Sequence, residues 1–96
     1  MGEMMSDQNN QEGFEINYSS LILGFSSAAL SYLGYMKETP DGSGMNLNLA
    51  KQNIDIIALL KDKTNGNLSD EEQRLTEAVL ADLRLKYVEK AKTVTK

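Results

Sequence analysis

Carboxylates are the side chains whose types and spacing come nearest to a catalytic set in this sequence. Glu71 is followed directly by Glu72, and Asp82 precedes Glu89 in the same charged segment. Paired carboxylates perform general acid–base catalysis when a pocket shifts the pKa of one of them. On a charged helix they usually form a solvated face instead. We therefore expect no catalytic residue and no enzymatic activity.

The absence of histidine and cysteine limits the catalytic and metal-binding roles that this chain can have. The sequence has no histidine and no cysteine, so it lacks the commonest general base, any thiol nucleophile and the usual transition-metal ligands. The segment from Thr39 to Gly44 has the small polar residues of a calcium loop, but Asp41 is its single carboxylate, and a calcium loop needs several. We interpret it as a connector and expect no metal and no cofactor.

Asp55 stands out among the acids because it lies inside the apolar run from Ile54 to Ile57. A carboxylate on an apolar face is normally paired with a base. Lys51, one helical turn earlier, and Arg84, in a later segment, are both candidate partners. We interpret these three residues as candidates for a structural ion pair. If the site is buried, Asp55→Ala should cost about 1–3 kcal/mol or more.

The segment from Ile16 to Met36 contains no charged residue, although a quarter of the chain is charged. A helix that is apolar on every side must be surrounded by protein or by lipid. Small residues recur along it at heptad intervals and therefore line one helical face: Ser20, Gly24, Ser27, Ser31 and Gly34. Such stripes occur both in the cores of monomers and in self-association faces, and both readings stay open.

Hydrophobic periodicity predicts an all-α, three-helix domain in which the apolar first helix is central. The helices are expected near residues 17–37, 46–64 and 69–91. Residues 1–13 are expected to be a disordered tail, residues 14–92 the domain, and residues 93–96 a frayed end. No segment has the sustained alternation of a strand.

Capping residues mark the helix boundaries. Asn17 or Ser19 is the expected N-cap of the first helix, and Asn46 or Asn48 that of the second. Ser69 and Glu72 form the pattern of a capping box at the start of the third. The first helix is expected to stop near Lys37, before Pro40, and the second at Asn65-Gly66.

The net charge of −4 is unevenly distributed, because the final segment from Arg84 to Lys96 is basic and the rest is neutral or acidic. A nucleic-acid-binding chain would normally carry a larger positive field, so we expect no nucleic-acid partner. Basic residues near the end of the third helix complement the negative end of its dipole.

Several short motifs resemble an uncharacterised bacterial family, the domain of unknown function 1844. The resemblance extends from about Tyr18 to Lys92, and its most specific part is the segment from Lys63 to Ser69. The other matching motifs are Ser19-Ser20-Leu21, Ala28-Ala29-Leu30, Asn48-Leu49-Ala50, Ile54-Asp55, Asp82-Leu83-Arg84 and Tyr87-Val88. The resemblance implies a bacterial, cytoplasmic protein and brings no activity, ligand or catalytic residue.

These observations favour a small non-catalytic helical module that works by association. An uncharged first helix cannot be fully covered by two others, and exposed apolar patches usually mark interaction sites. We expect a homo-oligomer, most simply a dimer, with the small-residue stripe of the first helix at the interface. Leu59, on the polar side of the second helix, is a further contact candidate, and an unidentified protein partner stays open. The alternative is a membrane-associated protein that inserts residues 16–36, which the serines and the lack of a flanking positive bias disfavour.

Overall fold

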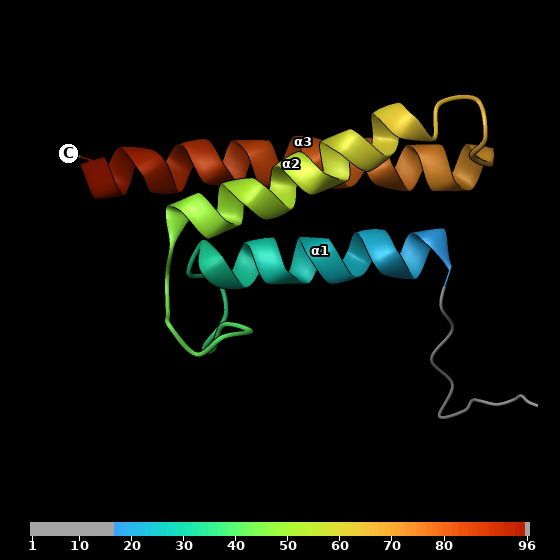
Figure 1. Ribbon diagram of the computed structural model, residues 1–96. Helices are drawn as coiled ribbons and strands as arrows, with labels where there is room; N and C mark the ends of the chain where they lie inside the picture. Colours follow the sequence, from blue (N-terminus) through green and yellow to red (C-terminus); the bar gives the residue numbers. More distant parts are fainter. Residues whose placement is uncertain (1–16, 96) are drawn as a thin grey trace, which may run out of the picture.

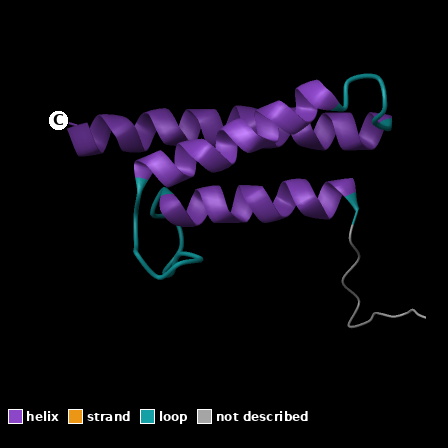
Figure 2. Ribbon diagram, in the orientation of Figure 1, coloured by secondary structure: helices purple, strands orange, loops and turns teal. Residues whose placement is uncertain are grey.

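Three α-helices make up the part of the chain that the computed structural model describes, residues 17–95 (Figure 1). They are α1 (Tyr18–Tyr32), α2 (Leu47–Lys63) and α3 (Asp70–Thr95). Each helix contacts the other two, and the described residues contain no strand (Figure 2). The predicted three-helix, all-α architecture is therefore confirmed. The tail expected at residues 1–13 lies outside the described residues.

Each N-terminal cap is one of the residues that the sequence offers, with Asn17 in place of Ser19 and Asn46 in place of Asn48. The Asn17 side chain accepts a hydrogen bond from the Ser20 backbone N–H at 2.9 Å, and Ser20 Oγ accepts one from the Asn17 N–H. Asn46 caps α2 through Leu49 N–H. Ser69 and Glu72 exchange the two hydrogen bonds of a capping box at α3. Each pair satisfies backbone donors that a helix start leaves unpaired.

α1 ends at Tyr32, short of the predicted end near Lys37. The reason is Gly34, which adopts a left-handed φ of 94°. Gly34 N–H donates to Ser31 O and Tyr35 N–H donates to Leu30 O, both at 3.0 Å. These two bonds form a Schellman motif, which stops the helix well before Pro40. α1 therefore has 15 residues and is shorter than expected.

α3 continues to Thr95, beyond the predicted end near Ala91. No glycine or proline follows Gly66 in the sequence, so no residue forces the backbone out of the helix. Lys92 lies in the last turn, where its charge complements the helix dipole. At the other end, Gly66 has the predicted left-handed φ, 87°, in the turn that separates α2 from α3.

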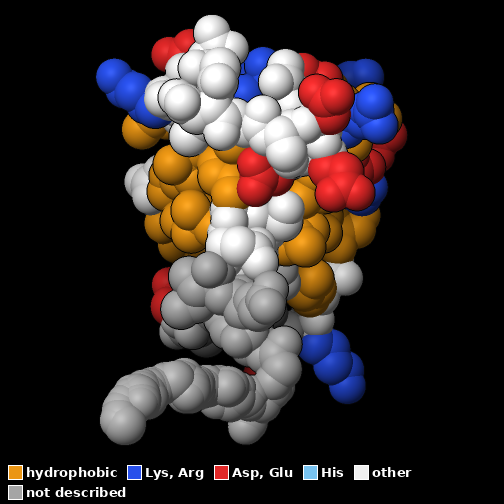
Figure 3. Space-filling view, turned by 90° about the vertical axis from the view of Figure 1, so that its right-hand side faces the viewer, with side chains coloured by type: hydrophobic (Ala, Val, Ile, Leu, Met, Phe, Trp, Pro, Cys, Tyr) orange, Lys and Arg blue, Asp and Glu red, His pale blue; other side chains and the backbone are white. Residues whose placement is uncertain are grey.

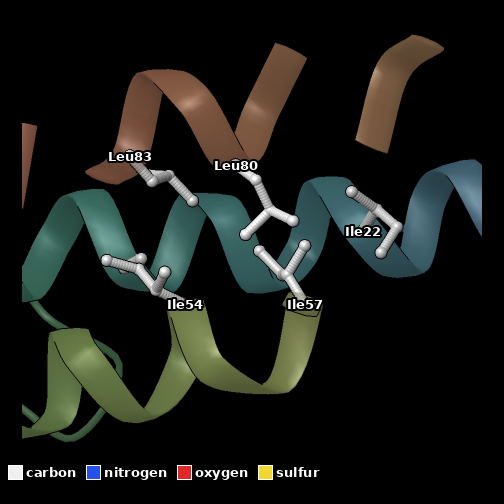
Figure 4. Packing of buried hydrophobic residues seen from close by; sticks show 6 residues of the cluster. Ile22, Ile54, Ile57, Leu80 and Leu83 are labelled. Carbon is white, nitrogen blue, oxygen red and sulfur yellow. The ribbon is translucent and has the colours of Figure 1, made fainter. Parts of the chain in front are cut away.

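The core lies where the three helices meet (Figure 4). Ile22 of α1 points toward side chains of the other two helices, and every residue of the main cluster is almost fully buried. The cluster consists of Ile22, Ala29, Ile54, Ile57, Leu80 and Leu83. A second cluster at the other end contains Tyr32, Leu33 and Ala50, and Tyr87 of α3 packs against both clusters. Burial of these apolar side chains is the main force that holds the helices together.

Within residues 17–95, no helix is both long and apolar enough to cross a bilayer. The 15 residues of α1 have a length of about 22 Å, whereas the hydrocarbon core of a membrane is about 30 Å thick.

Candidate association surface

The small-residue stripe predicted on the first helix lies partly on the outward face of α1. Ile22 and Ala29 mark the inward face, because both side chains are fully buried in the core. Gly24 and Ser27 lie on the opposite side of the helix and are exposed. A Cβ added at Gly24 would meet no atom of residues 17–95 within 4 Å beyond its own turn of helix. Both residues occupy surface positions, and the outward face of α1 is open around Gly24. Ser27 is exposed but has the Met36 side chain beside it, since its Oγ donates to Met36 Sδ at 4.0 Å.

Two members of the stripe are not on this open face. Ser31 is buried, and its Oγ donates a hydrogen bond to Met36 Sδ at 3.1 Å. Gly34 lies beyond the end of α1, in the turn that closes the helix. The helix stop after Tyr32 folds Met36 back over this end of the stripe. The predicted face is therefore shorter than expected and centres on Gly24 and Ser27.

Large apolar side chains flank the open part of the stripe. Leu21 lies on one side and Leu23 on the other, and 44% and 50% of their surfaces are exposed. Ser20 lies at the start of the stripe and is held by its cap bonds to Asn17. In Figure 3, hydrophobic side chains form a band below most of the charged ones in that view. The surface of α1 is thus uncharged and partly apolar, and within residues 17–95 no other segment covers Gly24.

Leu59 of α2, the further contact candidate, lies at the surface, with 54% of its area exposed. It belongs to α2, so it does not join the stripe of α1. Ile56, which the periodicity places on the apolar face of the second helix, is also exposed. The exposed part of α2 therefore carries two large apolar side chains of its own.

Asp55 is paired with Lys51 but is not buried. Lys51 Nζ donates to Asp55 Oδ2 at 2.9 Å, and 62% of the Asp55 side chain is exposed. The hydrogen bond and the charge of Asp55 raise the pKa of Lys51. Asp55, Lys51 and Arg84 all line one shallow hollow between α2 and α3. Within the described residues, however, Arg84 forms no ion pair with Asp55. Asp55 therefore faces water, as its neighbour Ile56 does, and the condition of burial under which its loss would cost about 1–3 kcal/mol or more is not met.

Asp55→Ala is therefore expected to shift the melting temperature by no more than about 2 °C, since exposed ion pairs one helical turn apart stabilise little. Thermal unfolding followed by circular dichroism measures the shift. Lys51→Ala serves as the matched control, because it removes the same pair from the other side. A loss of more than about 5 °C for Asp55→Ala alone would show that the carboxylate has a second, structural role.

The connector between α1 and α2 uses its carboxylate internally. Asp41 Oδ1 accepts hydrogen bonds from Ser43 N–H at 3.0 Å and from Ser43 Oγ at 2.7 Å. These bonds lower the pKa of Asp41, with smaller contributions from the hydroxyls of Tyr32 and Thr39. The pKa of Tyr32 is raised, mainly because its hydroxyl is buried and to a smaller extent because it bonds to Asp41. Asp41 thus organises its own turn, in keeping with the interpretation of this segment as a connector.

Asp82 and Glu72, two of the carboxylates that the sequence analysis considers, have local structural partners. Asp82 forms an ion pair with Lys86 one turn later on α3. Glu72 takes part in the capping box of the same helix. Among the described residues, no group of three or more carboxylates lies close enough to hold a metal ion.

One surface is missed by the sequence analysis, the outward side of α3. Leu85 and Val88 belong to the apolar content of this helix, but 60% and 50% of their surfaces are exposed. Beside them, two shallow hollows follow the junction of α2 and α3, and Arg84 lines both. A heptad count along α3 places Leu85 and Val88 on a different row from Leu80 and Leu83, but only the packing of α3 shows which of the two rows faces outward.

A family model described as a domain of unknown function, DUF1844, matches residues 15–89. The chain belongs to this family. The match covers α1, α2 and most of α3, and it confirms the resemblance drawn from the short motifs. Neither the curated proteins nor the solved structures include a match to this DUF1844 chain.

Proposed function

We propose that this DUF1844 chain is a non-catalytic helical association module that forms a homo-oligomer, most simply a dimer, through the outward face of α1. The proposal rests on the open, uncharged surface around Gly24, with Leu21 and Leu23 exposed on its two sides. An apolar patch of this kind gains free energy when a partner covers it.

The distribution of charge supports a second copy as the partner. Two copies each carry a net charge of −4 and therefore repel one another on average. α1 has no charged residue between Tyr18 and Tyr32, so two copies that meet there bring no like charges together. Gly24 and Ser27 lack bulk, which allows two helix backbones to approach closely. A two-fold axis across this face gives a closed dimer.

Gly24→Leu is the test of this face. The bulky side chain would project from the centre of the contact, and we expect it to raise the dissociation constant of the oligomer at least about tenfold. Light scattering coupled to size exclusion, over a range of micromolar concentrations, measures the mass. Gly24→Ala is the matched control, because it keeps the position small while removing the glycine.

The stability of the same variants separates lost association from lost folding. Leucine and alanine both favour a helix more than glycine does, so neither variant should unfold the single chain. A wild-type mass of one chain at these concentrations contradicts the proposal. If the wild type is an oligomer and Gly24→Leu leaves its mass unchanged, the interface does not lie on the outward face of α1. Leu59→Glu then tests the exposed surface of α2.

A further inference from the structure

The outward side of α3 carries a row of residues at alternating intervals of four and three. The row faces away from the core and consists of Arg74, Ala78, Ala81, Leu85, Val88 and Lys92, all exposed. Its four central members are apolar, and Leu85 and Val88 are among the most exposed large hydrophobic residues of the part of the chain that the structure describes. Exposed apolar residues with this spacing have the arrangement of the seam along which two helices pack in a coiled coil.

The surface beside the row is hollowed rather than flat. One hollow lies between α2 and α3 next to Ala81, and its charged lining consists of Lys61 and Asp62 of α2 and Glu77 and Arg84 of α3. A second hollow lies further along the same junction, next to Val88. Side chains of a helix laid along the row would have room to enter these hollows.

The charged residues beside the row indicate which helix can pack on it. Glu77 and Arg84 are seven residues apart, so they occupy the same side of the row with opposite charges. The Arg84 side chain has no ion-pair or hydrogen-bond partner within residues 17–95, and the Glu77 side chain has only Gln73 Nε2, at 3.2 Å. A second α3 that runs antiparallel places its own Arg84 at Glu77 and its own Glu77 at Arg84. The pattern is therefore complementary to itself.

The same charges determine how the two antiparallel α3 helices are aligned along their length. A two-fold axis midway between Ala78 and Ala81 forms both Glu77–Arg84 pairs and sets small residues at the closest approach of the two helices. An axis at the level of Leu83 would instead bring the two copies of Arg84 together, which is unfavourable.

We infer that α3 carries a second self-association surface, on which another copy of this chain packs antiparallel with its α3 about an axis between Ala78 and Ala81. This surface is separate from the outward face of α1 and does not depend on the contact proposed there. Each of the two surfaces is two-fold symmetric, so either one alone gives a dimer, whereas both together give an assembly of more than two copies.

Charge reversal tests the inference. Glu77→Arg and Arg84→Glu each place like charges opposite one another, and each should raise the dissociation constant of the α3 contact at least about tenfold. The double variant E77R/R84E restores opposite charges and should recover the wild-type mass in light scattering. Both residues are exposed, and circular dichroism verifies that the variants remain folded.

Mixing the single variants gives an independent readout. The chain with two positive charges on the row and the chain with two negative charges should bind each other, although each associates weakly with itself. The α1 contact is unaffected by these changes, and Gly24→Leu does not alter the row, so the two proposals fail separately. Single variants that keep the wild-type mass, a double variant that is not restored, or a mixture without heteromeric complexes would overturn the inference.

Discussion

Leu83→Ala is expected to lower the free energy of unfolding by about 2–5 kcal/mol. Leu83 is fully buried where α3 meets the other two helices, and its side chain belongs to the main core cluster. The substitution removes most of a buried apolar side chain. It leaves a cavity that the packed helices cannot close completely. Urea unfolding followed by circular dichroism measures the loss. The core of this chain is small, so the loss is a large fraction of its stability.

Leu85→Ala is the matched control for this prediction, because it is the same substitution two residues later on the same helix. With 60% of its surface exposed, Leu85 should change the free energy of unfolding by less than about 0.5 kcal/mol. The comparison is made at a dilution where light scattering finds single chains, so that association does not contribute. Equal losses for the two variants would contradict the placement of α3 against the core.

Gly34→Ala is expected to lower the free energy of unfolding by about 1–2 kcal/mol, because the left-handed φ of 94° is unfavourable for any residue with a Cβ. An added Cβ would also lie 3.5 Å from Met45 Sδ, an ordinary contact, so backbone strain and not steric overlap causes the loss. The same urea titration measures it.

Gly24→Ala is the control with the opposite expected sign. Gly24 lies inside α1 and has open space around it, so alanine should raise the free energy of unfolding by about 0.5–1 kcal/mol through helix propensity. If Gly34→Ala stabilised the chain to the same extent, α1 would have to continue past Tyr32 as a regular helix, and the Schellman motif would be wrong.

Features that depend on near neighbours along the chain can be predicted from the order of the amino acids. Asn17, Asn46 and Ser69 are identifiable as caps because their side chains bond to backbone N–H groups three residues away. Gly66 is identifiable as a helix stop for the same local reason. The number of helices and their order follow from such signals and from hydrophobic periodicity, and the family follows from the match of short sequence motifs.

The end of α1 is predictable in principle, but the sequence analysis places it too late. Gly34 and Pro40 are both helix-ending residues, and the choice between them depends on tertiary contacts of the residues beyond Tyr32. Asn46 N–H donates to Tyr32 O, and Tyr35 packs under Lys86 and Lys90 of α3. These contacts favour the earlier stop, at Gly34.

Which sides of the helices face outward depends on the tertiary packing. α1 is uncharged on every side, so its sequence does not distinguish the buried side of Ile22 from the open side of Gly24. Asp55 lies among isoleucines yet faces water, and Leu85 and Val88 are apolar yet exposed. The physical reason is that burial is set by where the other two helices pack, through contacts between residues far apart in the chain, whereas caps and turns are set by hydrogen bonds within a few residues.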